Sequence, residues 1–336
     1  MSAAPTRVES PRASEIAEVT QPIRDAVLRA PPRRLLALGY WGGAYTAPTG
    51  ESVTIYASRS YPADDAANQR WANFLAGLVH GPELSSLTVY LAPLDEVKST
   101  CGPEAEACYN AARSTLFAPG EDLPNGTSAE AVVTHEYGHH VAAHRSNAPW
   151  PAEDLGTKRW ASYEQVCSKT ASGILFPGDE QLHYTFNPGE AFAESYRVLN
   201  ERRAGTPEPP WQVVDQSLYP DDTALQLLEQ DVLDPWTGPT SASFSGTLVA
   251  TGARRRTYTV TDALDGALQL TLRAPAKSRL ALDLYGAGGK RLAHVTTRPA
   301  GETVSTQTTI CGSRSFQVSI SRVSGGGHYR LLVSKP

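Results

Sequence analysis

Hydrophobic residues follow two different rhythms along the 336-residue chain, and the change falls near residue 235. Upstream, strand-like runs such as SVTIYAS and LTVYLAP are separated by ADDAANQRWANFLAGLV, in which apolar residues recur with the period of a helix. Downstream, hydrophobic and polar residues alternate in about eight short runs divided by Gly- and Pro-bearing turns. The first rhythm predicts an α+β domain, and the second predicts an all-β sandwich.

Turn-rich stretches divide the chain further. DPWTGPTSAS, just after the change of rhythm, has the Pro/Gly/Ser/Thr composition of a linker. The polar N-terminal stretch contains one predicted helix over residues 14–28. We therefore expect an N-terminal extension (1–35), an α+β domain (36–235), a linker (236–243) and a β-sandwich domain (244–336).

Further helices are predicted in the second half of the α+β domain. One of them contains no proline and follows the capping-box signature Thr127-Ser-Ala-Glu130. Another opens at Asn187-Pro188, because asparagine is a favoured N-cap and proline is favoured at the first helical position. The predicted spans are 129–145, 158–169, 187–203 and 223–233.

Charge and composition exclude several classes of protein. The net charge is −5 and the basic residues are scattered, so the chain lacks the basic stripe that nucleic-acid binding requires. It has no run of 18 apolar residues, so we expect no membrane-spanning helix. We expect a monomer with no nucleic-acid partner.

The four cysteines bear on the compartment. Cys101 and Cys108 bracket a Gly- and Pro-containing loop, CGPEAEAC, and CxxC zinc spacings are absent, so we predict a disulfide between the two. Cys167 and Cys311 lie far apart, and the sequence leaves open whether they pair or stay reduced. The polar N-terminus lacks the apolar core of a signal peptide. The predicted disulfide nevertheless favours a secreted protein whose signal peptide has been trimmed.

Four of the eight histidines lie in one predicted helix, within THEYGHHVAAH. Residues four apart share a helical face, so either His135 with His139 or His140 with His144 could bind one ion. Only the first pair has a carboxylate, Glu136, directly after its first histidine, and a hydrolytic zinc site requires a general base beside its water. The pattern selects the first pair, and the second pair is predicted to be structural.

A zinc hydrolase normally uses a third protein ligand. Arg145 stands where the metzincin pattern requires a histidine, and Trp160 stands where an aspzincin-like pattern requires an aspartate. Neither class therefore fits. A glutamate on a later helix remains, and GEAFAESY places Glu190 and Glu194 on one helical face.

This arrangement resembles the gluzincin metallopeptidases, in which HExxH is followed by a helix bearing a ligand glutamate and, four residues on, a second acid. The nearest variant is the anthrax lethal factor type, whose helix also reads Glu, two residues, Ala, Glu; the match covers residues 128–203. The resemblance implies a zincin-like catalytic domain with a small β-sheet, and zinc as the cofactor. It implies that His135, His139 and Glu190 bind the metal and that Glu194 hydrogen-bonds one of the histidines.

The resemblance extends to two other parts of the chain. In the lethal factor type a tyrosine lies shortly before the ligand glutamate, which makes Tyr184 the implied donor to the oxyanion. The alternating segment 244–336 resembles the pre-peptidase C-terminal domains of secreted bacterial proteases in pattern and position.

Two other interpretations of the helix predicted over residues 187–203 stay open. Glu190 also stands where it would complete a capping box with Asn187, in which case Glu194 would be the third ligand. A surface helix without any metal would show the same polar stripe of Glu190, Glu194, Arg197 and Glu201.

The function expected from these residues is that of a secreted zinc metalloendopeptidase. Glu136 would act as general base toward a metal-activated water, and a polypeptide substrate would be hydrolysed. The substrate would add as a strand to an edge formed by residues 112–119. Two alternatives are a zinc hydrolase acting on a non-peptide amide or ester, and a non-catalytic secreted binding or adhesion protein that retains the motif.

Overall fold

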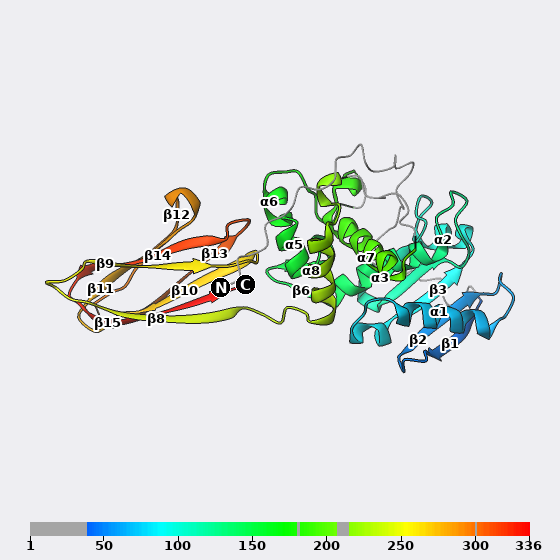
Figure 1. Cartoon of the computed structure of the whole chain (residues 1–336), viewed down its shortest axis with the longest axis horizontal. Helices are drawn as coiled ribbons and strands as arrows, with labels where there is room; N and C mark the ends of the chain where they lie inside the picture. The colour runs from blue at the N-terminus through cyan, green and yellow to red at the C-terminus, as the bar shows by residue number, and fades with distance from the viewer. Residues whose placement is uncertain (1–38, 180–181, 207–214, 300) are drawn as a thin grey trace.

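The chain folds into an α+β unit and an all-β unit placed end to end (Figure 1). The computed structural model describes residues 39–179, 182–206, 215–299 and 301–336. The expected α+β class and the expected β-sandwich are both present. The helix predicted over residues 14–28 lies outside the described residues.

A mixed five-stranded sheet forms the end of the α+β unit that is farther from the sandwich (Figure 1). Its strand order is β1-β2-β3-β5-β4, with parallel pairs in the middle and an antiparallel pair at each edge. The strands are Tyr40–Thr46 (β1), Ser52–Ser58 (β2), Thr88–Ala92 (β3), Cys108–Asn110 (β4) and Thr115–Pro119 (β5).

The expectation that residues 112–119 form an edge strand is wrong. β5 lies between β3 and β4, and all five of its residues are buried, as in the central strand of a covered sheet. The edge on this side of the sheet is β4, which is only three residues long and begins at Cys108. Cys101 and Cys108 form the predicted disulfide.

Helices cover both faces of this sheet. Helices α1 (Asp65–Gly77) and α3 (Ala129–Ala143) pack on one face, and α2 (Leu94–Cys101) packs on the other. Side chains alternate along β5 accordingly, so that Leu116 joins the core under α3 and Phe117 joins the cluster around α2.

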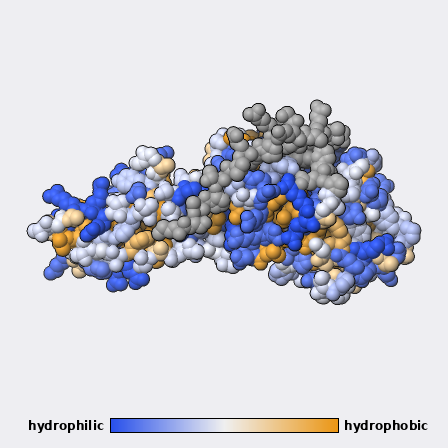
Figure 2. Space-filling model, in the orientation of Figure 1, coloured by the Kyte–Doolittle hydropathy of each residue, from blue (hydrophilic) through white to orange (hydrophobic). Residues whose placement is uncertain are grey.

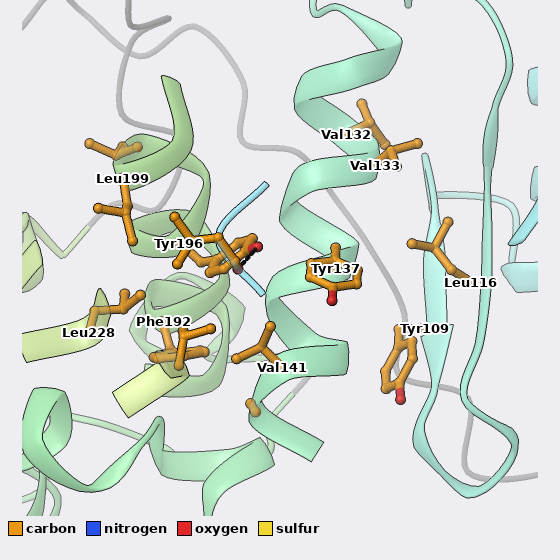
Figure 3. Packing of buried hydrophobic residues seen from close by; sticks show 14 of the residues in the cluster. Tyr109, Leu116, Val132, Val133, Tyr137, Val141, Phe192, Tyr196, Leu199 and Leu228 are labelled. Atoms are coloured by element: carbon orange, nitrogen blue, oxygen red, sulfur yellow. Dashed lines mark hydrogen bonds between the residues drawn. The ribbon is translucent and has the colours of Figure 1, made fainter. Parts of the chain in front are cut away.

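Helix α3 is buried between the sheet and helix α7 (Pro188–Ala204) (Figure 3). Val133 and Tyr137 of α3 belong to the same core as Leu116 of the sheet and Tyr196 of α7. The helix begins where the capping-box signature predicted, but its cap is Ser128 instead of Thr127: Oγ of Ser128 accepts a hydrogen bond from the Ala131 amide at 3.1 Å.

The helices predicted over residues 187–203 and 223–233 are present as α7 and as α8 (Asp222–Leu233). The single helix predicted over residues 158–169 is wrong. Gln165 has a φ of 60°, and this left-handed residue divides the segment into α5 (Lys158–Tyr163) and α6 (Val166–Ala171).

The remaining short elements of the α+β unit are Ser146–Asn147 (β6), Trp150–Pro151 (β7), Ala152–Leu155 (α4) and the 3-10 turns Pro82–Ser86 (η2), Ala111–Arg113 (η3), Tyr184–Phe186 (η4) and Gln216–Leu218 (η5). A further 3-10 turn, Ala287–Gly289 (η6), lies in the all-β unit.

Two antiparallel four-stranded sheets make the sandwich, in the orders β13-β10-β15-β8 and β12-β11-β14-β9. Their inward side chains form one core, separate from that of the α+β unit. The strands are Thr240–Leu248 (β8), Arg255–Thr261 (β9), Gly266–Arg273 (β10), Arg279–Tyr285 (β11), Arg291–Thr296 (β12), Thr303–Ile310 (β13), Ser315–Ser324 (β14) and Gly327–Lys335 (β15). The sandwich begins at Thr240, inside the expected linker, because Thr240 pairs with Lys335 of β15.

Outside the residues drawn in grey, the face shown in Figure 2 carries hydrophilic residues with hydrophobic residues among them. Across the described ranges, no helix is long and apolar enough to cross a membrane.

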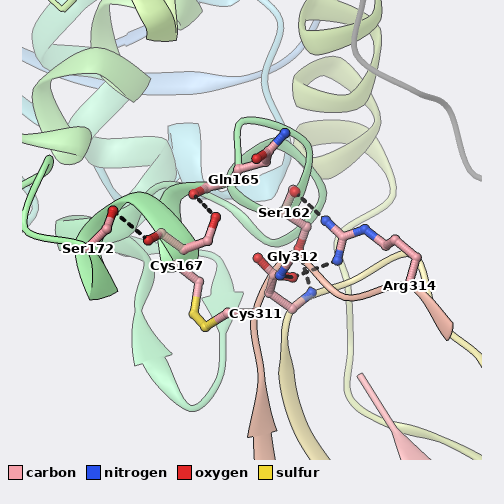
Figure 4. The surroundings of a disulfide bond; sticks show 9 residues. Ser162, Gln165, Cys167, Ser172, Cys311, Gly312 and Arg314 are labelled. Carbon is pink, nitrogen blue, oxygen red and sulfur yellow. Dashed lines mark hydrogen bonds and ion pairs between the residues drawn. A yellow bond between two sulfur atoms is a disulfide. The ribbon is translucent and has the colours of Figure 1, made fainter. Parts of the chain in front are cut away.

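The two units are joined by more than the chain connection. Cys167 of α6 forms a disulfide with Cys311, which follows β13 (Figure 4), so the pairing that the sequence left open is settled. Beside it, Arg314 donates to Oδ1 of Asp265 and to the carbonyl oxygen of Ser162, both at 2.6 Å. The sandwich is therefore covalently fixed to the α+β unit at a second point.

We expect loss of this disulfide to destabilise the protein more than loss of the other one. The Cys167–Cys311 bond spans 144 residues and the Cys101–Cys108 bond spans 7. By loop-closure entropy, replacing both cysteines of the long loop by serine should lower the free energy of unfolding by about 5 kcal/mol, against about 2 kcal/mol for the short loop. Denaturant unfolding of the two double variants measures the difference, and equal losses would contradict it.

Candidate metal centre

Helices α3 and α7 approach each other unusually closely at a glycine. A Cβ atom on Gly138 would lie 2.7 Å from Cα of Ala193 and 3.0 Å from its carbonyl oxygen, so a larger residue would push the two backbones apart. The sequence showed Gly138 only as a weak helix former. The sequence could have indicated this close approach. A glycine inside a helix costs about 1 kcal/mol relative to alanine, and its presence therefore indicates a packing requirement.

The close approach brings three predicted residues together. Nε2 of His135 lies 3.3 Å from Oε2 of Glu190, and Nε2 of His139 lies 3.4 Å from the same oxygen. One potential ligand atom from each residue lies within 4.8 Å of the others, and all three side chains are buried. This group could hold a metal ion.

The donor set and its spacing fit a metal. Two imidazoles and a carboxylate are ligands that zinc accepts, and two ligands at about 2.05 Å from a tetrahedral zinc ion lie about 3.4 Å apart. The two separations from Glu190 have this length, which is long for a charge-assisted hydrogen bond. Oε1 of Glu190 is also buried and makes no hydrogen bond with any described residue.

The structure does not show the capping box or the solvated polar stripe that the competing interpretations of α7 require. Asn187 caps the helix alone, accepting a hydrogen bond from the Gly189 amide at 3.0 Å, while the Glu190 carboxylate lies against the histidines. Glu190, Glu194 and Arg197 are each 0% exposed, so this stripe is not the solvated face of a surface helix.

The structure places Glu194 behind the metal-binding group. Its Oε2 lies 3.0 Å from Nδ1 of His135, on the side of the ring away from Glu190. Arg197 contacts the same carboxylate through Nε at 3.0 Å and Nη2 at 2.5 Å. In the sequence, Arg197 was only a member of a polar stripe and had no assigned role. Its spacing of three residues from Glu194 could have predicted the ion pair, because residues three apart are neighbours on a helix.

Charges in the cluster stabilise one another. Burial alone would raise the pKa of Glu194, but Arg197 and His135 outweigh burial and hold that pKa at about 2. Burial would lower the pKa of His135, yet the Glu190 and Glu194 carboxylates raise it to about 10 in the metal-free protein. Glu190 also has its pKa held well below the usual range by the two histidines, despite its burial. The carboxylates are therefore ionised at neutral pH, as a cation site requires.

Two further predicted residues lie beside this group. Glu136 directly follows His135 on α3, is 0% exposed and contributes no atom to the metal-binding group. Tyr184, in the turn η4 before α7, is half-buried, and its hydroxyl donates to Oε2 of Glu190 at 3.1 Å.

The second histidine pair has a structural setting. His140 is buried, with Nδ1 2.9 Å from the hydroxyl of Tyr109 and Nε2 2.9 Å from the carbonyl oxygen of Glu83. Burial lowers the pKa of His140 to about 4, so the ring is neutral. Nδ1 of His144 lies 2.9 Å from the carbonyl oxygen of His140. Neither ring belongs to the metal-binding group.

Comparisons with known proteins do not assign a family. No protein-family model matches the chain, and no curated protein matches it. Similar solved structures include the pre-peptidase C-terminal domain of collagenase from Bacillus anthracis, with 13% identity, 27% of this chain and 88% of that chain covered, and a TM-score of 0.23. The Yersinia pseudotuberculosis-derived mitogen has 16% identity, covers 29% of this chain and 87% of its own, and has a TM-score of 0.23. A family GH115 4-O-methyl-alpha-glucuronidase has 10% identity over 62% of this chain and 39% of its own, with a TM-score of 0.22.

Proposed function

We propose that this protein is a secreted zinc metallopeptidase of the gluzincin type. The observation that carries the proposal is the convergence of His135, His139 and Glu190: one ligand atom from each lies within 4.8 Å of the others, and the two separations to Glu190, 3.3 and 3.4 Å, fit the edge of a zinc tetrahedron. The two disulfides support export to an oxidising compartment. The gluzincin resemblance of the two helices supports a peptide substrate.

Each residue has a distinct task in this proposal. His135, His139 and Glu190 would hold zinc, which when bound supplies a Lewis acid that activates water at neutral pH. Glu136 accepts the proton of the attacking water and passes it to the leaving amine. Tyr184 donates a hydrogen bond to the oxygen that becomes negative in the transition state.

Metal removal tests the proposal. The purified chain should contain about one equivalent of zinc by elemental analysis and should cleave members of a peptide library, followed by mass spectrometry. A strong chelator should abolish cleavage, and stoichiometric zinc should restore it, because in this proposal the bound zinc is the Lewis acid that activates the water.

The alternatives give different results in the same assay. Zinc-dependent hydrolysis of a small ester or amide without cleavage of any peptide would favour a non-peptide hydrolase. Bound zinc without hydrolysis of either substrate class would favour a binding or adhesion protein. A chain that binds no zinc at all would overturn the metal site itself.

A further inference from the structure

The buried arginine of α7 is held entirely by carboxylates. Arg197 is 0% exposed, and a buried guanidinium is tolerated only when it is paired. It contacts both oxygens of Glu194, at 3.0 and 2.5 Å, and its Nη1 donates to Oε2 of Glu201 at 2.5 Å. The two contacts to Glu194 form a bidentate fork, which fixes the plane of that carboxylate as well as its position.

The fixed carboxylate in turn fixes an imidazole. Oε2 of Glu194 receives the Nε hydrogen of Arg197 and also lies 3.0 Å from Nδ1 of His135. When His135 is neutral, a hydrogen bond donated by Nδ1 to Glu194 would leave the lone pair of Nε2 available to a metal ion, and Nε2 is the nitrogen on the side of Glu190. Without the fork, Glu194 could rotate about its side-chain bonds, and the orientation of the ring would no longer be determined.

We propose that Arg197 is a positioning residue of the metal centre: by clamping Glu194 it orients His135 so that Nε2 faces the metal. The inference rests on the proposed metal site. It assigns Arg197 an effect on metal affinity, which a purely structural ion pair inside a helix would not have.

A second buried ion pair, between Arg145 just after α3 and Glu83 of η2, offers a matched control. Arg145 donates from Nη2 to Oε2 of Glu83 at 2.9 Å, and the two side chains are 5% and 1% exposed. This ion pair is nearly as buried as that of Arg197. Glu83 accepts a contact from the structural histidine His140 at its carbonyl oxygen, and among the described residues it hydrogen-bonds none of the three metal-binding residues. Breaking it should cost stability without changing the metal centre.

The experiment compares Arg197→Met, Arg197→Lys and Arg145→Met in the full chain. Zinc affinity is measured by competition with a chromophoric chelator, and the absorption spectrum of the cobalt(II)-substituted proteins reports on ligand geometry. We expect Arg197→Met to bind zinc about 10- to 100-fold more weakly and to alter the cobalt spectrum. Arg197→Lys should fall between this variant and the wild type, because lysine keeps the charge and loses the fork. Arg145→Met should lower the unfolding temperature and leave zinc affinity unchanged.

A double variant shows whether Arg197 acts through Glu194. In a Glu194→Gln background, Arg197→Met should weaken zinc binding little further, because the two residues form one unit. Wild-type zinc affinity in Arg197→Met, or an equal loss in Arg145→Met, would overturn the inference. If Arg197→Met does not fold, wild-type affinity in Arg197→Lys would overturn it. A wild-type chain without zinc affinity would overturn the proposed function as well, whereas a wild-type chain with zinc and activity isolates the role of Arg197.

Discussion

Replacement of Glu136 by glutamine is expected to lower kcat for peptide cleavage by about 100- to 10,000-fold while the purified protein keeps its zinc. Glutamine has the size of glutamate but cannot accept a proton. Glu136 is fully buried next to His135 and supplies no atom to the metal-binding group, so the metal should stay bound while proton transfer is lost. Steady-state kinetics combined with elemental analysis of the same preparation check both parts.

Glu130→Gln is the matched control for this variant. Glu130 lies on the same helix, one residue after its start, and its side chain is exposed. We expect wild-type kcat, because the substitution changes the charge of α3 without entering the site. A zinc-replete Glu136→Gln protein with wild-type kcat would rule out Glu136 as the general base, and loss of zinc from that variant would give Glu136 a role in metal binding instead.

The residues of the metal-binding group were predictable because a local rule covers two of them. The i, i+4 spacing of His135 and His139 places both rings on one helical face wherever the helix lies. No local rule connects them to Glu190, which is 51 positions after His139; that assignment came from a resemblance. The contact itself depends on the close approach of Gly138 to Ala193, which is a property of two packed helices and not of either one alone.

Long-range pairing explains what the sequence did not predict. β5 is an inner strand because β4 pairs with it, and a three-residue strand is too short to have a recognisable period. The break at Gln165 has no glycine or proline to mark it. The sandwich was predictable because its strands alternate clearly. However, β8 begins with the small, mostly polar residues TSAS, whose composition is that of a linker.

Replacement of Glu190 by alanine is expected to remove zinc from the purified protein and, with it, the activity. Glu190 provides one of the three ligand atoms, and its Oε2 is the atom that both histidines approach. Glu194→Gln is the matched comparison. Glu194 lies against the far nitrogen of His135 and not against the metal-facing atoms, so its replacement should weaken zinc binding by about 10- to 100-fold. The loss in Glu190→Ala should exceed this range, because a ligand bond is removed instead of its support. Chelator competition measures both affinities.

The two variants together locate the third ligand. Full zinc retention by Glu190→Ala would reject Glu190, and loss of zinc from Glu194→Gln alone would transfer the ligand role to Glu194. Both substitutions also change a buried charge, so the metal-free proteins must be compared by circular dichroism and thermal unfolding. A variant that keeps the fold of the metal-free wild type but binds zinc more weakly has a defect in metal binding and not in folding. This comparison separates metal binding from folding at a site where the same side chains serve both.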